Sequence, residues 1–180
     1  MRVIAGRYGG RRLQAPRGRT TRPTSDRVRE ALFAMLGEVQ GTRVLDLFAG
    51  TGALGIEAIS RGARQAVFVE RDRGAIEAIE ANIGALGLSG EQALIRREDV
   101  ESALKTARKR KETYDLVLID PPYGRANEVG PWLQAGLPGV LAPGARVVLE
   151  SDRRTPLGLE LALEKERRYG DTMIAIHRHA

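Results

Sequence analysis

From residue 43 to residue 180, short apolar runs alternate with longer amphipathic segments, and this alternation restricts the fold more than any other feature. The short runs read as strands at residues 44–48, 66–70, 93–95, 116–119 and 146–149. Apolar residues recur at helical spacing between them, at residues 54–60, 73–86, 100–110 and 131–137. Strands that are apolar throughout are typical of a parallel sheet covered on both faces. Right-handed crossovers then predict an α/β fold with a doubly wound, mostly parallel, Rossmann-like sheet.

The two ends of the chain add further elements. Residues 159–167 and 172–177 read as two strands around a tight turn, which brings the expected sheet to seven strands. Residues 2–14 predict an N-terminal hairpin around a glycine-rich turn, followed by a helix that Gly37 ends. Pro131 is expected in the first turn of its helix. We therefore predict a basic extension over residues 1–40 and a sheet domain over residues 41–180.

Composition excludes several classes of site. The chain has 180 residues, which suits one globular domain, and it has no cysteine, which excludes disulfides, thiolate metal sites and cysteine nucleophiles. Its two histidines, His177 and His179, lie beside each other near the C-terminus, so we expect no metal site. Arginines interrupt the first residues, and the longest uncharged stretch, residues 129–145, contains three prolines. We expect neither a targeting segment nor a membrane span, and hence a cytoplasmic protein.

Positive charge is concentrated in the N-terminal extension. Residues 1–30 contain nine arginines against two acids, whereas residues 31–180 contain 20 basic and 21 acidic residues. Such clustering favours a polyanion partner, most often a nucleic acid, although a general preference for arginine is the alternative. Arg7, Arg11 and Arg12 are the best candidates for RNA contacts because they belong to the predicted hairpin.

A glycine loop follows the first strand of the predicted sheet. Gly50, Gly52 and Gly55 form a GxGxxG pattern between a strand and a helix, where small residues let the backbone approach a ligand. Glu70 follows the second strand, twenty residues beyond Gly50, at a position that suits the ribose hydroxyls of a nucleotide. This pattern fits NAD enzymes and S-adenosylmethionine enzymes about equally.

Asp46 distinguishes between these two cofactors. It lies within the strand that leads into the loop, where a carboxylate would repel a pyrophosphate. A carboxylate there would help to hold the loop and the cationic amino-acid end of S-adenosylmethionine. The alternative is that Asp46 only caps the amides of the loop.

The Asp120-Pro121-Pro122-Tyr123 sequence at the end of the fourth strand is the most specific motif. Proline lacks an N–H and fixes φ, so this loop is stiff and Asp120 is extended. Asp120 and the Pro121 carbonyl can accept both N–H groups of an exocyclic amine, while Tyr123 can stack on the base that carries it. Held in this way, the amine nitrogen is oriented toward an electrophilic methyl group. The alternative is a rigid turn without a ligand.

The order of these features resembles class I S-adenosylmethionine-dependent amino-methyltransferases, with Asp99 after the third strand as a further match. Two N-terminal segments narrow the resemblance: Arg-Val-Ile-Ala-Gly at residues 2–6 and Thr-Arg-Pro-Thr-Ser-Asp-Arg-Val-Arg-Glu-Ala-Leu-Phe at residues 21–33. With them, essentially the whole chain is similar to the RsmD family, the bacterial 16S rRNA guanine-N2 methyltransferases.

The resemblance implies methyl transfer from S-adenosylmethionine to the N2 amine of a guanine in 16S rRNA, either free or in the small-subunit particle. It also implies two sets of site residues. The cofactor-binding set is Asp46, Phe48, Gly50, Gly52, Glu70, Asp99 and Thr24. The guanine-holding set is Asp120, Pro121, Pro122 and Tyr123. In this assignment Glu70 holds the ribose and Asp99 the adenine amine, although Thr24 is equally a plain N-cap and Asp99 equally part of a solvated acidic run.

Three other classes remain open on the sequence. A NAD-dependent oxidoreductase fits the glycine loop but gives no reason for the Asp-Pro-Pro-Tyr motif. An RNA-binding module without activity does not explain the intact loop and Asp120. An amino-methyltransferase acting on DNA or another RNA, at adenine N6 or cytosine N4, fits the same motif, although about 40 residues are few for reading sequence in a groove. We expect a monomer.

Overall fold

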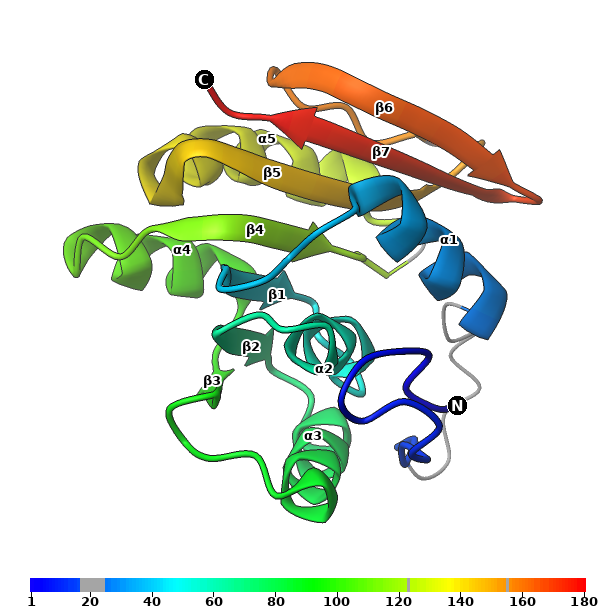
Figure 1. Ribbon diagram of the computed structural model, residues 1–180. Coiled ribbons are helices and arrows are strands. Elements are labelled where there is room, and N and C mark those ends of the chain that lie inside the picture. Colours follow the sequence, from blue (N-terminus) through cyan, green and yellow to red (C-terminus); the bar gives the residue numbers. More distant parts are fainter. Residues whose placement is uncertain (17–24, 123, 155) are drawn as a thin grey trace.

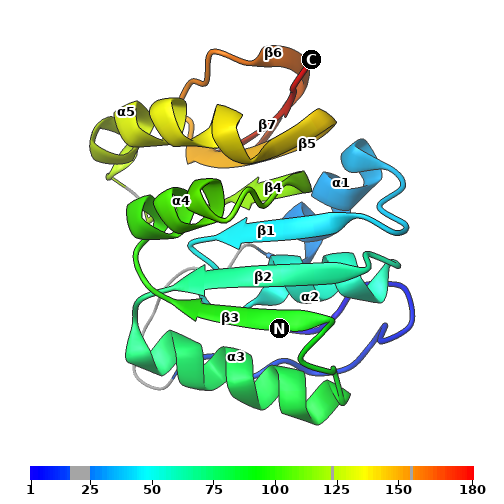
Figure 2. The ribbon, with the colours of Figure 1, turned by 90° about the vertical axis from the view of Figure 1, so that its left-hand side faces the viewer.

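The computed structural model describes residues 1–16, 25–122, 124–154 and 156–180. Its centre is a seven-stranded sheet with the strand order β3-β2-β1-β4-β5-β7-β6 (Figure 1). The strands are β1 (Arg43–Leu47), β2 (Gln65–Glu70), β3 (Ala93–Arg97), β4 (Tyr114–Ile119), β5 (Leu141–Asp152), β6 (Ala162–Tyr169) and β7 (Thr172–Arg178). The first five run parallel, and β7 pairs antiparallel with β5 and β6 (Figure 2). The predicted mostly parallel, seven-stranded α/β sheet is confirmed.

Helices cover both faces of the sheet. One face carries α1 (Asp26–Leu36), α2 (Ala53–Ser60) and α3 (Arg73–Leu86), and the other carries α4 (Val100–Lys109), α5 (Ala126–Gly136) and the 3-10 helix η1 (Leu137–Val140). Successive strand residues alternate between the two cores: Leu116 packs with the α1–α3 side and Val117 with the α4–α5 side. This alternation follows from the strand period of two and explains why the strands are apolar throughout.

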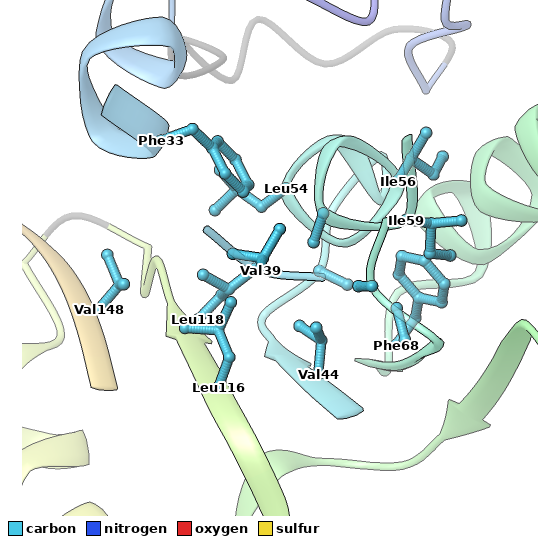
Figure 3. Packing of buried hydrophobic residues seen from close by; sticks show 14 of the residues in the cluster. Phe33, Val39, Val44, Leu54, Ile56, Ile59, Phe68, Leu116, Leu118 and Val148 are labelled. Carbon is cyan, nitrogen blue, oxygen red and sulfur yellow. The ribbon is translucent and has the colours of Figure 1, made fainter. Parts of the chain in front are cut away.

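The N-terminal extension shares the core of the sheet domain. Phe33 of α1 lies beside Leu54 of α2, above the strand residues Leu116 and Val148 (Figure 3). Burying a Phe or Leu side chain contributes about 1.5–3 kcal/mol, so these contacts fix α1 on the sheet. The predicted division at residue 40 therefore does not coincide with a boundary between two cores.

The predicted N-terminal hairpin is reduced to one β-bridge, between Arg2 and Arg12. Its turn lies against α2, where the Arg7 amide donates to the Ser60 carbonyl at 2.7 Å. A Cβ at Gly6 would come within 1.9 Å of the same carbonyl oxygen, so only glycine allows this close approach. The segment therefore runs along the helix surface and does not project from the domain.

The helix limits largely follow the local sequence signals. Ser25 caps α1 by accepting from the Val28 amide at 3.2 Å, and Gly37 ends it at φ +75°. The prediction for Pro131 is wrong because α5 begins earlier, at Ala126, and Pro131 lies in its interior. Among the residues that the structure describes, no helix has the length and apolar character needed to cross a membrane.

Candidate active site

A large cleft opens at the carboxyl ends of the parallel strands, where ligands bind in doubly wound sheets. Its volume is about 1390 Å³, more than the ~300–1,000 Å³ of ordinary ligand pockets. The described lining includes ten carboxyl side chains and five cationic ones, so the cleft favours a cationic ligand.

The cleft brings together most of the predicted site residues. Those that line it are Asp46, Phe48, Gly50, Glu70, Asp99, Asp120, Pro121 and Pro122. Two other predicted residues, Tyr123 and Thr24, lie outside the described residues.

The glycines of the loop have different environments. Gly50 has φ +57° and lines the cleft, whereas Gly52 has φ +75° and caps α2. A Cβ at Gly52 would lie 3.3 Å from the Phe68 ring, so its Cα faces the core. At Gly55 the same added atom would come within 2.4 Å of that ring. Gly50 thus opens the backbone to the cleft, and the other two let α2 pack closely on the sheet.

Asp46 is buried and joins the strand end to α2. Its Oδ2 accepts from the Gly55 amide at 2.9 Å. Burial raises the pKa of Asp46 well above its ordinary value, the Gly55 bond opposes this, and the charges of Asp120 and Glu70 add to it. Glu70 at the end of β2 and Asp120 just after β4 therefore repel the carboxyl group of Asp46 in β1, and a cation between them would relieve the repulsion.

The carboxylate of Glu70 is held in place by the backbone. Its Oε2 accepts from the Gly50 amide at 2.9 Å, and its Oε1 accepts from the amides of Arg71 and Asp72 at 2.8 and 2.9 Å. Since a carboxylate has about four acceptor positions, one remains on Oε2 for a ligand hydroxyl. Glu70 therefore fixes the glycine loop and can still accept a hydrogen bond from the cleft.

Asp99 is the N-cap of α4. It is exposed and accepts from the Ser102 amide and hydroxyl, both at 2.9 Å. The Ser102 amide lowers the pKa of Asp99, so its carboxylate stays ionised at the rim of the cleft. Its capping role was not among the sequence interpretations, which considered only a cofactor contact or a solvated acidic run.

Asp120 follows directly after β4, as the motif predicts. Because Ile119 is in register with Leu47 of β1, Asp120 lies next to Phe48 where the two strands end. Asp120 is half-buried, and Pro121 and Pro122 continue along the cleft. The stiff motif and the glycine loop thus face one cavity.

Sequence reasoning missed an aromatic wall of the cleft. Trp132 of α5 lines it, and its ring lies 6.1 Å from that of Phe48 at an interplanar angle of 40°. Phe48 has φ +61°, a left-handed conformation that is unusual for a non-glycine residue and directs the chain into the loop. Trp132 is the single tryptophan of the chain, which was the available signal.

Asp152, Arg154 and Asp171 were also missed. Asp152 ends β5, and the rule that ligands bind at carboxyl ends of parallel strands could have identified it. Arg29 of α1 lines the cleft as well, and its complete burial could not be seen in the sequence.

None of the three predicted RNA-binding arginines lines the cleft, and Arg7 and Arg11 lie at the far ends of α2 and α3. Arg7, Arg11 and Arg12 are exposed, and Arg11 donates to the Ala85 carbonyl, near the end of α3, at 3.0 Å. Helices that follow parallel strands run back toward the amino-terminal ends of the strands, so the C-terminal ends of α2 and α3 are far from the cleft. The separation is on the order of 10–20 Å, from a rise of 1.5 Å per helical residue.

The chain matches one family model over residues 1–178, that of the family described as Conserved hypothetical protein 95. It is 39% identical to "Putative rRNA methyltransferase YlbH" of Bacillus subtilis over 99% of this chain and 98% of that protein. It is 36% identical to "Ribosomal RNA small subunit methyltransferase D" of Escherichia coli over 69% of this chain. That match spans 61% of the E. coli protein, less than two thirds of its length.

Solved structures with the same fold support this relationship. The structure called "Putative methyltransferase yhhF" from Escherichia coli has a TM-score of 0.82 and 32% identity, covering 99% of this chain and 97% of that one. The T. thermophilus 16S rRNA N2 G1207 methyltransferase (RsmC), in complex with AdoMet and guanosine, has a TM-score of 0.69 and 25% identity. That similarity covers 91% of this chain and 44% of the T. thermophilus protein.

Proposed function

The chain belongs to the family described as Conserved hypothetical protein 95, the RsmD family, and from this premise we propose that it methylates the N2 amine of a guanine in 16S rRNA, using S-adenosylmethionine. The observation that carries the proposal is that the Asp120-Pro121-Pro122 motif and the Gly50–Glu70 pair line one cavity. The volume of that cavity, about 1390 Å³, leaves room for a nucleoside beside a cofactor.

The residues of the cleft fit S-adenosylmethionine, which supplies an electrophilic methyl group on a sulfonium cation. Asp46, Glu70 and Asp120 make the cleft favourable to positive charge: burial is the main cause of the raised pKa of Asp46, and the charges of Asp120 and Glu70 add to it. Gly50 leaves the loop backbone open, and Glu70 keeps one acceptor position for a ribose hydroxyl. Asp99, ionised at the rim, is suited to accept from the adenine amine.

The target amine would be held by the motif after β4. Asp120 and the Pro121 carbonyl accept its two N–H groups, and the proline rings keep these acceptors fixed. Tyr123 is expected to stack on the guanine ring. Fixed acceptors stabilise the positive charge that develops on nitrogen during attack, and the methylated amine then loses a proton without a tuned general base.

The choice of guanine N2 over adenine N6 or cytosine N4 is supported by family membership and not by a particular contact. One relative named as a putative rRNA methyltransferase and another named as a small-subunit rRNA methyltransferase support rRNA as the substrate. The structural neighbour that holds AdoMet and guanosine is an N2 methyltransferase of 16S rRNA, which supports the same atom. Arg7, Arg11 and Arg12, exposed on the face of α2 and α3, would contact phosphates away from the cleft.

Thermal stabilisation by ligands tests the cofactor. S-adenosylhomocysteine should raise the melting temperature and NADH should not, because only a ligand of the folded state stabilises it. Replacing Glu70 with alanine should weaken this effect through loss of the ribose acceptor. It should also lower the melting temperature of the free protein, since three backbone amides lose their acceptor. Stabilisation by NADH alone would contradict the proposal.

A further inference from the structure

Arg29 is completely buried and is held by α1 and the N-terminal segment. Its Nη2 donates to the Arg2 carbonyl and, at 3.0 Å, to Asp26 Oδ1. A guanidinium has five N–H groups, and the remaining three belong to Nε and Nη1. Both of these atoms are buried and have no hydrogen-bond partner among the described residues.

The buried acid beside Arg29 does not account for these donors. Glu57 is also fully buried, but its carboxylate already accepts from the amides of Ile4 and Ala5 and from Arg61 Nε. The Nε of Arg29 lies 3.9 Å from Glu57 Oε2, which gives charge attraction without a hydrogen bond. Buried donors without acceptors are costly and rare, so their presence in a ligand cleft calls for an acceptor that the described part of the chain does not supply.

The start of α2 independently favours an anion in the same cleft. Ala53 and Leu54, the first residues of α2, line the cavity together with Arg29. The amino end of a helix carries partial positive charge and backbone N–H groups that have no acceptor within the helix. Arg29 and the α2 terminus thus both present positive charge to a cleft that is rich in carboxylates.

We propose that Arg29 binds the carboxylate of the amino-acid end of S-adenosylmethionine, a role that rests on the proposed function. A carboxylate supplies acceptors for the donors on Nη1 and Nε, and its charge suits the α2 terminus. Asp46 and the other strand-end carboxyl groups remain for the cationic groups of the same ligand. Arg29 is thereby a positioning residue that sets the direction in which the cofactor lies.

The test compares two ligands that differ in one group. Decarboxylated S-adenosylmethionine lacks the carboxylate and carries one more positive charge than S-adenosylmethionine. In a cleft dominated by carboxylates, that extra charge alone would make the decarboxylated ligand bind more tightly. A side chain that binds the carboxylate would reverse this order of affinities. Calorimetric titration of the wild-type protein should therefore show a preference for S-adenosylmethionine of about tenfold or more.

Substitution of Arg29 then separates binding from folding. The Arg29→Gln variant should lose the preference between the two ligands, and Arg29→Lys, which keeps the cation, should retain part of it. Arg27 is an exposed residue of the same helix, and Arg27→Gln should leave the preference between the two ligands unchanged. If Arg29 only holds α1 in place, the variants will weaken the binding of both ligands by the same factor and leave the ratio of the two affinities unchanged.

Three results would overturn the inference. One is a wild-type protein that binds the decarboxylated ligand equally or more tightly, and this result does not depend on any variant folding. Another is an unchanged ligand ratio in Arg29→Gln. The third is a loss of RNA affinity in that variant with the ligand ratio intact, which would assign Arg29 to an RNA phosphate. Failure of both ligands to bind the wild type would instead contradict the proposed function.

Discussion

Asp46 should make the stability of the protein depend on pH at the level of one carboxyl group. Burial raises its folded-state pKa above the ordinary 3.8, so the unfolded chain ionises first as the pH rises. Its contribution to stability is complete below pH 3.8 and is lost as the pH rises through the folded-state pKa. Asp46→Asn keeps an acceptor for Gly55 and cannot ionise. As the pH rises from about 4 through the folded-state pKa, urea unfolding should therefore show the free energy of unfolding of the variant increasing relative to that of the wild type. A difference that stays constant with pH would contradict the assignment.

Asp120 should separate catalysis from cofactor binding. Asp120→Ala removes the carboxylate that is proposed to hold the amine, so methyl transfer should fall by at least about a hundredfold. Cofactor affinity, measured by titration, should change by less than about tenfold, or 1.4 kcal/mol. Asp115→Ala is the matched control, because Asp115 is an exposed acid on the same strand that accepts from the Arg43 amide. Parallel loss of affinity and activity in Asp120→Ala would place Asp120 in the cofactor site.

Residue spacing predicted where the site residues lie, and not all of what they contact. Glu70 and Asp120 were predictable because strand ends in a parallel sheet converge on one edge. The hydrogen bond from Gly55 to Asp46 was not, since it depends on how closely α2 approaches β1. Complete burial of Arg29 depends in the same way on how α1 packs against α2.

At the scale of elements, Glu57 should be essential for attaching the N-terminal segment to α2. It is fully buried and accepts from two N-terminal amides and from Arg61. Glu57→Ala removes the fully buried counter-charge that lies 3.9 Å from the buried Arg29, so the free energy of unfolding should fall by about 3–5 kcal/mol. Glu77→Ala, which removes an exposed helix ion pair with Arg73, should scarcely change it. Equal effects in urea unfolding would contradict the buried network.

The turn after Arg2 should act as an RNA-contacting element. Substituting Arg7, Arg11 and Arg12 with alanine should weaken RNA binding and reduce the slope of log affinity against log salt by about 2–3 units, up to one per lost phosphate contact. Cofactor affinity should be unchanged, because none of these residues lines the cleft. Alanine at Lys109, Arg110 and Lys111, exposed at the end of α4 on the other face, removes equal charge as the control. Parallel slopes for wild type and the first variant would exclude the turn as an RNA surface.

Element prediction succeeded where the local signals were complete. The bounds of α3, residues 73–86, were predicted correctly from its periodicity, and Gly87, whose φ is +65°, ends the helix. The strand expected at 146–149 extends over Leu141–Asp152, because pairing with β4 and β7 recruits residues that have no strand pattern. The interior position of Pro131 was missed for a similar reason: residues 126–130 have weak helical periodicity.

At the scale of the whole molecule, the cleft lies at the carboxyl ends of the parallel strands, and the turn that carries Arg7 lies toward their amino ends. The apolar core that joins α1 to β4 and β5 makes this arrangement rigid, since Phe33, Leu116 and Val148 belong to one cluster. A substrate that enters the cleft and reaches Arg7 must extend along α2 over a distance on the order of 10–20 Å, as structured RNA can.

Identification of the methylated nucleoside tests the central claim most directly. Ribosomal small-subunit particles from cells that lack the corresponding activity are incubated with the protein and S-adenosylmethionine labelled in its methyl group, and the 16S rRNA is then digested to nucleosides. The account predicts that the label is found in N2-methylguanosine, and that Asp120→Ala forms none. Label in N6-methyladenosine or N4-methylcytidine, or no label in RNA despite tight cofactor binding, would contradict it.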